Sequence, residues 1–320
     1  MKHTWSVTLM LVGLFVIAQL IGLGIIAAGS NQTMNEDGSF SVAFDDTALG
    51  PRPVMSGFEG FTYIIIGIAI GTGVLLLLIK FNLLAVWKLW FFLAVFLALT
   101  IALGTLLPFA YALALAFALA SWKIWRPNFI IHNITEVLIY SGITWLIVPN
   151  IPLGYVAILL LVIAVYDAYA VWRSKHMVAM AQFQTDSKLF AGLSIPYTMV
   201  SVAPKSAKNV KLKTTKVKMG KDVALGVKPV ARAMEGRNAI LGGGDIAFPL
   251  FFTGATLISL LGKGFSVGAA YGYSLIVVVG ATIALTGLFL AAKKDRFYPA
   301  MPFIAAGCFV GYGVLWLVAL

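Results

Sequence analysis

The stretch LWFFLAVFLALTIALGTLLPFAYALALAFALASW, residues 89–122, decides how many helices this chain forms. It contains no charged residue. A single helix of that length would extend about 51 Å, whereas the hydrocarbon core of a membrane is about 30 Å thick. Gly104 and Pro108 lie near its middle, and both residue types interrupt helices. The sequence therefore predicts two short spans here, over residues 89–106 and 108–122.

The composition of the whole chain places it in a membrane. Hydrophobic residues make up 61% of the sequence and charged residues 11%, whereas soluble domains are about half apolar and about one quarter charged. The first uncharged run is longer than the apolar region of a signal peptide, so we expect it to remain as a span. The predicted fold class is an all-α polytopic membrane protein with nine transmembrane helices. The predicted spans are residues 5–28, 61–79, 89–106, 108–122, 130–148, 153–172, 239–261, 266–291 and 299–319.

The distribution of charge predicts how these spans are oriented. Thirteen of the 23 Lys and Arg residues lie between Arg173 and Arg237, and the segment 29–60 is acidic. With the N-terminus in the cytoplasm and the C-terminus outside, nearly all basic residues fall on the cytoplasmic side, as the positive-inside rule requires. The chain then divides into residues 1–172 with spans one to six, a basic cytoplasmic loop over 173–238, and residues 239–320 with spans seven to nine.

The same loop bears on the partners of the protein. A basic cytoplasmic loop is expected to contact lipid headgroups. Its cations are mostly lysines without interleaved aromatic residues, which argues against a nucleic-acid partner.

Two acidic residues fall inside predicted spans. Asp167 occurs in LLLVIAVYDAYAVW (159–172) and Asp245 in LGGGDIAFPLFF (241–252). Charged groups at such depth are costly and are kept mostly for function. Asp167 precedes Arg173 by six residues, about 9 Å, and Asp245 follows Arg237 by eight residues, about 12 Å. Because the two spans run in opposite directions, both carboxyl groups are expected at nearly the same height.

A pair of carboxyl groups at one height suits two functions. If the two helices touch, the pair would share one proton. An ionised aspartate can then take a proton from a water that attacks a peptide carbonyl, while the protonated aspartate bonds to the carbonyl oxygen. The alternative is a proton or cation relay in a channel or transporter. Depth alone favours transport, because transporters are commoner.

The other residues that could take part in chemistry are expected to have structural roles. Glu136 and His132 lie close to the cytoplasmic start of the fifth predicted span, where interfacial water can solvate them, so we expect a structural role. Cys308 is the only cysteine and has no disulfide partner in the chain. The histidines number three and are scattered, so neither a zinc site nor a cofactor is expected.

Three short motifs reverse the order of the two hypotheses. Tyr166-Asp167, Gly242-Gly243-Gly244-Asp245 and Pro299-Ala300-Met301-Pro302 resemble the YD, GxGD and PAL motifs of the presenilin and signal peptide peptidase family. Members of that family are intramembrane aspartyl proteases. The motifs also occur in the family's order and on the matching spans.

The resemblance implies roles for these residues. Asp167 and Asp245 would form the catalytic dyad. The remaining motif residues would line the active site or substrate cleft: Tyr166, Gly242, Gly243, Gly244, Pro299, Ala300 and Met301. Met301 replaces the leucine of PAL, a swap that nearly conserves volume. Gly243 fills the variable position of GxGD, which in the family bears on substrate choice, so Gly243→Leu is expected to shift the cleavage site with the fold intact.

The resemblance also implies a setting. The orientation resembles that of presenilin, whereas Pro249 is more similar to the signal peptide peptidase branch; an archaeal homologue in the cell membrane is expected. Its partners would be single-span transmembrane substrates and membrane lipid, with a homo-oligomer left open. The alternation over 209–219 indicates a short strand, which in the family would pair with an extended substrate; the alternative, expected without substrate, is a disordered basic linker. From the residues alone, 172–183, including His176, would extend the sixth span as an interfacial helix. The runner-up stays a cation channel or proton-coupled transporter that uses the same aspartates.

Overall fold

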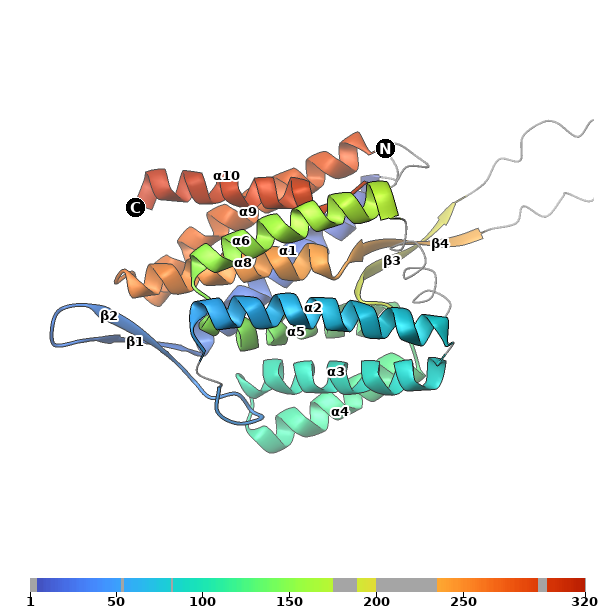
Figure 1. The fold of residues 1–320 in the computed structure, drawn as a ribbon, viewed down its shortest axis with the longest axis horizontal. Coiled ribbons are helices and arrows are strands. Elements are labelled where there is room, and N and C mark those ends of the chain that lie inside the picture. Colours follow the sequence, from blue (N-terminus) through green and yellow to red (C-terminus); the bar gives the residue numbers. More distant parts are fainter. Residues whose placement is uncertain are drawn as a thin grey trace, which may run out of the picture. The chain divides into compact units, whose positions relative to one another are not determined.

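The computed structural model describes residues 5–52, 55–81, 83–174, 189–199, 235–292 and 298–319. Contacts divide the chain into one unit of residues 1–195 with 239–320 and a second unit of residues 196–238. Of the second unit, only residues 196–199 and 235–238 are described, and they belong to strands. Every described helix belongs to the first unit (Figure 1).

Nine helices lie side by side in the first unit, with short turns between several of them (Figure 1). They are α1 (Trp5–Ala28), α2 (Gly57–Lys80), α3 (Leu84–Gly104), α4 (Phe109–Trp125), α5 (Phe129–Ile147), α6 (Leu153–Tyr169), α8 (Gly244–Gly262), α9 (Val267–Ala291) and α10 (Met301–Ala319). Among the described residues, eight helices are long and apolar enough to cross a membrane, and α4 is a shorter apolar helix. The predicted all-α architecture of nine apolar helices is confirmed, and the sidedness of the termini stays a prediction.

Glycine and proline divide the helices where the sequence predicts. Helix α3 ends at Gly104, and Pro108 directly precedes the first residue of α4. Two hydrogen bonds to the carbonyl of Leu103 close the turn between these helices. Pro152 precedes α6 in the same way, after a single 3-10 turn over Val148–Asn150. The long uncharged run 89–122 is therefore two helices, because proline cannot donate the helical hydrogen bond.

The seventh predicted span needs a correction at its start. Residues 239–242 are not helical; they end strand β4 (Glu235–Gly242), which pairs with β3 (Gly192–Met199). Helix α8 begins only at Gly244. The hydrogen bond from the amide of Gly243 to the carbonyl of Ala191 (3.2 Å) extends the contact with the β3 segment. Glycine is a poor helix former, which favours an extended chain up to Gly242 and a helix that begins only at Gly244.

A hairpin that the sequence did not predict occupies part of the acidic segment. Strands β1 (Ser30–Met34) and β2 (Phe40–Phe44) are antiparallel, and Ser30 lies opposite Phe44. Gly38 allows the turn between them, with a φ of 81°. The hairpin projects from the end of the bundle opposite to the start of β3 (Figure 1). Its Gln32 side chain donates to the carbonyl of Leu261 at 2.7 Å, which ties the hairpin to the end of α8.

Helix α8 is the centre of the bundle. It packs against α1, α5, α6, α9 and α10. Of the residues in its most apolar stretch, 67% are buried inside the structure. Leu250, Phe252 and Leu257 are fully buried along it. Gln19 of α1 donates to the carbonyl of Ile246 at 3.0 Å, so even the first turn of α8 is fixed by a neighbouring helix. The helix that carries Asp245 is thus packed against five other helices.

Helices α9 and α10 approach each other closely through three glycines. A Cβ at Gly280 would collide with the carbonyl of Gly307, and a Cβ at Gly307 would collide with the carbonyl of Gly280. A Cβ at Gly311 would lie 2.8 Å from Cα of Val277 and 2.9 Å from the carbonyl oxygen of Ile276. Small residues permit such backbone contact between membrane helices.

Gly311→Val is therefore expected to destabilise the protein by about 1–3 kcal/mol, as overpacking of a filled interface does. The obstacle is backbone, which cannot turn aside as a side chain can. Gly313→Val is the matched control, since a Cβ at Gly313 meets nothing within 4 Å. Thermal unfolding of the two purified variants in detergent measures the difference. Equal melting temperatures would show that the interface tolerates extra volume.

Candidate active site

Asp167 lies near the C-terminal end of α6, where that helix meets the start of α10. Its side chain is buried, with 6% of the residue exposed. One carboxylate oxygen, Oδ2, accepts a hydrogen bond from the backbone amide of Met301 at 3.1 Å. Helix α6 ends two residues later and continues as one π-helical turn over Ala170–Ser174. The acid that the sequence places in a span is thus anchored by the chain at Pro299-Ala300-Met301.

Asp245 is the second residue of α8, directly after the three glycines. Its Oδ2 lies beside Gly242, the last residue of β4, at 3.1 Å from the place that a Cβ of that glycine would take. Asp245 is partly exposed and Gly244 is exposed, whereas Ile246 is fully buried. Asp245 therefore lies where the packed part of α8 begins.

The structure brings the two aspartates together. Helices α6 and α8 pack against each other, and the carboxyl groups of Asp167 and Asp245 are close enough to interact electrostatically. Helix α10 contacts both of these helices and supplies the amide of Met301. Two acids from distant parts of the sequence and one backbone donor thus form a single cluster.

The other motif residues surround this cluster in different ways. Pro299 and Met301 are buried, and Ala300 is partly buried. The carbonyl of Ala300 accepts from the amide of Ile304 at 3.1 Å, which begins α10. Tyr166 is 39% exposed, although it directly precedes the buried Asp167. Its ring therefore lies on a different face of α6 from the carboxyl group.

The three glycines before Asp245 are not equivalent. A Cβ at Gly244 would make ordinary contact with Phe248 at 3.5 Å. A Cβ at Gly243 would lie only 2.6 Å from the hydroxyl of Tyr140 and 3.1 Å from its ring. Tyr140 is buried, and its hydroxyl donates to Glu136, so a movement of the ring would break that hydrogen bond. A leucine at position 243 must therefore displace the side chain of Tyr140, and the expectation that Gly243→Leu leaves the fold intact stays a prediction.

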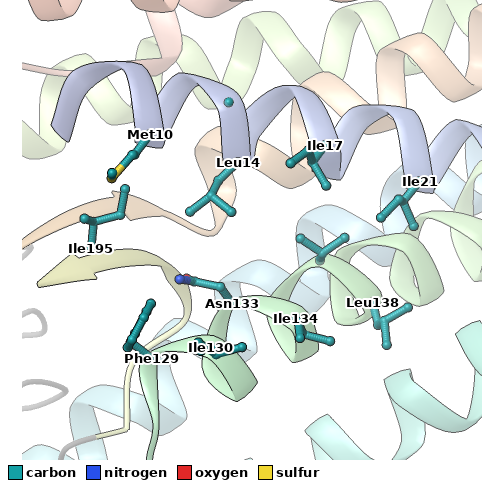
Figure 2. A pocket seen from close by; sticks show the side chains of 12 residues that line it. Met10, Leu14, Ile17, Ile21, Phe129, Ile130, Asn133, Ile134, Leu138 and Ile195 are labelled. Atoms are coloured by element: carbon teal, nitrogen blue, oxygen red, sulfur yellow. The ribbon is translucent and has the colours of Figure 1, made fainter. Parts of the chain in front are cut away.

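An apolar groove between α1 and α5 lies apart from the aspartates. It has a volume of about 640 Å³, and its lining includes neither Asp167 nor Asp245. Figure 2 shows Met10, Leu14 and Ile17 of α1 facing α5 across it. Its polar side chain, Asn133, is satisfied by two hydrogen bonds with the backbone of Ser194. The groove therefore presents only hydrocarbon and contributes nothing to an acid–base reaction.

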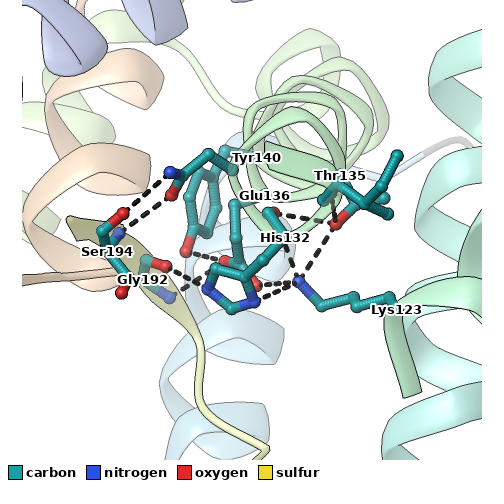
Figure 3. A network of polar contacts seen from close by, with 9 residues as sticks. Lys123, His132, Thr135, Glu136, Tyr140, Gly192 and Ser194 are labelled. Carbon is teal, nitrogen blue, oxygen red and sulfur yellow. Dashed lines mark hydrogen bonds and ion pairs between the residues drawn. The ribbon is translucent and has the colours of Figure 1, made fainter. Parts of the chain in front are cut away.

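A buried polar network next to Gly243 was not predicted from the sequence (Figure 3). Lys123 of α4 and Glu136 of α5 form an ion pair of 2.6 Å, although only 3% and 1% of these residues are exposed. The other oxygen of Glu136 accepts from the hydroxyl of Tyr140 and from the amide of Gly192. His132 bonds through Nε2 to the carbonyl of Gly192 at 2.8 Å.

The interfacial solvation of Glu136 that the sequence suggested is therefore wrong, whereas His132 is partly exposed. Glu136 is enclosed by protein, and its charge is neutralised by Lys123 rather than by water. His132, Glu136 and Tyr140 recur every four residues, which places them on one face of a helix. That spacing is the sequence signal that could have revealed the network.

Two further expectations concern metals and the cytoplasmic loop. Within the described ranges, no group of three or more His, Cys, Asp or Glu side chains could hold a metal ion. The expected strand over 209–219 and His176 lie outside the described residues, as does most of the loop 173–238.

Comparison with known proteins gives a consistent picture. The family model described as signal-peptide peptidase, presenilin aspartyl protease matches residues 12–319. Two solved structures, both described as a presenilin family intramembrane aspartate protease, are similar in fold. The one in space group C222 is 18% identical, covers 98% of this chain and 99% of its own, and has a TM-score of 0.57. The one in space group P2 is 18% identical, covers 97% and 98%, and has a TM-score of 0.58. No curated protein matches significantly.

Proposed function

Because this chain belongs to the signal-peptide peptidase and presenilin aspartyl protease family, we propose that it hydrolyses peptide bonds within the transmembrane helices of other membrane proteins. The catalytic residues in this proposal are Asp167 and Asp245. The proposal is carried by one observation above all, the convergence of these two carboxyl groups from α6 and α8.

The chemistry follows from two neighbouring carboxyl groups that share a proton. The ionised carboxylate takes a proton from water while the water oxygen bonds to the peptide carbonyl carbon. The protonated partner donates to the carbonyl oxygen, on which negative charge develops. When the tetrahedral intermediate collapses, the carbon–nitrogen bond breaks, and a proton passes from a carboxyl group to the leaving amine. The reaction consumes one water and needs no metal ion.

The surroundings of the two aspartates support a pair in which one carboxyl group acts as base and the other as acid. The amide of Met301 fixes one oxygen of Asp167, so its second oxygen is oriented. Asp245 is partly exposed and follows the exposed Gly244, so it lies nearer to the surface of the bundle than Ile246 does. A helical substrate hides its scissile carbonyl in its own hydrogen bonds, so it must unwind at the site. Glycines at 242 and 244, with space for a close approach, suit an unwound chain.

The runner-up is a proton or cation relay through the same aspartates. Paired acids within a membrane also serve transport. The match of an aspartyl protease family over residues 12–319 makes this the weaker candidate. The two functions differ in their products, because only a protease leaves two peptides.

Incubation of the purified protein with a synthetic single-span peptide tests the proposal. We expect two new fragments whose masses add up to the peptide plus one water, with the cut inside the apolar segment. The same protein in liposomes should give no proton or cation flux. An intact peptide together with an ion flux would instead establish the relay. The physiological substrates, the archaeal cell membrane and the state of assembly stay predictions.

A further inference from the structure

The buried carboxylate of Glu136 has more partners than a simple ion pair requires. Oε1 faces Lys123 at 2.6 Å, and Oε2 accepts from the amide of Gly192 at 2.9 Å and from the hydroxyl of Tyr140. One side chain of α5 therefore joins α4, its own helix and the start of β3 (Figure 3). Bonds of this kind to an ionised acceptor are about twice as strong as neutral ones.

Gly192 is held at both of its backbone groups. Its amide donates to Glu136, and its carbonyl lies 2.8 Å from Nε2 of His132. Lys123 lies 3.2 Å from Nδ1 of the same ring. Because an ammonium group can only donate, Nδ1 accepts and Nε2 carries the hydrogen that Gly192 receives. Gly192 has a φ of 150°, and a Cβ there would collide with the carbonyl of Leu241.

Two sets of contacts connect Glu136 with Gly243. The first runs through the backbone, because Ala191, the neighbour of Gly192, accepts the amide of Gly243 at 3.2 Å. The second runs through Tyr140, whose hydroxyl lies 2.6 Å from the place a Cβ of Gly243 would take. Both end two residues before Asp245. The position of that carboxyl group therefore depends on an acceptor oxygen in another helix.

We propose that Glu136 is a positioning residue for catalysis, whose Oε2 holds Tyr140 and Gly192 so that the glycine segment presents Asp245 to Asp167. This inference rests on the proposed proteolytic function. Glu136 does not touch the substrate, and it acts through the geometry of residues 191–192 and 243–245. Lys123 has a supporting part, since it neutralises the carboxylate and binds Oε1, which leaves Oε2 for Tyr140 and Gly192.

Two double variants separate the acceptor oxygen from the charge. Lys123→Met with Glu136→Gln removes both charges but keeps an oxygen that can replace Oε2. Its amide nitrogen can donate to Nδ1 of His132 or to the hydroxyl of Thr135, which lose Lys123 as donor. Lys123→Met with Glu136→Leu removes the charges and the oxygen together. Neither variant leaves an unpaired buried charge, so both are expected to fold.

We expect the variant with leucine to lose about 100-fold in kcat, as a small displacement of a reacting group does, with KM nearly constant. The variant with glutamine should keep most of the wild-type kcat. Amide hydrogen exchange gives a readout apart from activity: residues 189–195 and 239–245 should exchange faster with leucine than with glutamine. Equal kcat and equal exchange in the two doubles would overturn the inference.

A second pair of variants keeps the test open if the leucine double fails to fold. Tyr140→Phe removes only the hydroxyl and is expected to lower kcat about tenfold, less than the leucine double does, because Oε2 still holds the amide of Gly192. Ser141→Ala is the matched control, because its hydroxyl is equally buried and bonds only to the carbonyl of Val137 in its own helix. A Tyr140→Phe enzyme as fast as Ser141→Ala would also refute the inference.

The two proposals fail in different ways. If the wild-type protein cuts the peptide and both doubles cut it equally well, the proteolytic function stands and the role of Glu136 is refuted. If the wild-type protein cuts nothing, the proteolytic function is refuted. The exchange measurement then still decides whether the oxygen of Glu136 fixes the glycine segment.

Discussion

Asp245→Asn is expected to lower the rate of peptide cleavage by about 10⁴-fold, and Asp167→Asn is expected to do the same. Asparagine has nearly the volume of aspartate, and at position 167 its Oδ1 can still accept from the amide of Met301. It cannot take a proton from water or donate one as an acid. The fold should therefore survive while the reaction stops. Cleavage of a single-span peptide, followed by mass spectrometry, measures the loss.

Controls make this result specific. Glu36→Gln removes an acid in the exposed turn of the β1–β2 hairpin and should leave cleavage unchanged. The double aspartate variant should be no slower than either single one, since residues that act as a unit are not additive. Brisk cleavage by Asp167→Asn or Asp245→Asn would remove that residue from the dyad.

Breaking the buried ion pair on one side is expected to have the largest effect on stability. Lys123→Met leaves the carboxylate of Glu136 buried without its cation, which costs about 3–5 kcal/mol. Glu136→Leu leaves the ammonium group unpaired and should cost a similar amount. The pair lies at 3% and 1% exposure, so water cannot solvate the remaining charge. Thermal or denaturant unfolding in detergent measures the change.

The double variants provide the comparison for this prediction. Removing both charges should destabilise the protein far less than removing one, because no charge then stays unpaired. Lys88→Met, at an exposed position in α3, is the control for loss of a lysine and should change stability by about 0.5 kcal/mol or less. If both single variants were as stable as Lys88→Met, the ion pair would not form in the folded protein.

Much of the architecture was predictable because residues next to the helix ends determine where the helices begin and stop. The prolines at 108 and 152 mark helix starts without reference to any distant residue. The pairing of Asp167 with Asp245 was predicted from the helical rise along two opposed spans, although residues 237–242, which entered that calculation, are extended. The short YD and GxGD motifs then indicated the chemistry.

Other features depend on contacts that no local pattern contains. Residues 239–242 are apolar enough for a span, and only their pairing with β3 makes them extended. Lys123 lies near the end of α4, where a basic residue is expected to face water, yet it turns to Glu136 on another helix. The role of Gly243 is set by Tyr140, a hundred residues earlier in the chain. Such partners are chosen by tertiary packing rather than by propensity.

The glycine contact between α9 and α10 also has a mechanical consequence. Met301, which binds Asp167, is the first residue of α10, and Gly307 and Gly311 follow it at about 9 Å and 15 Å along the axis. Because α9 and α10 meet backbone to backbone at these glycines, neither helix can shift towards the other. The amide of Met301 therefore keeps its place relative to α9 as well as to Asp167.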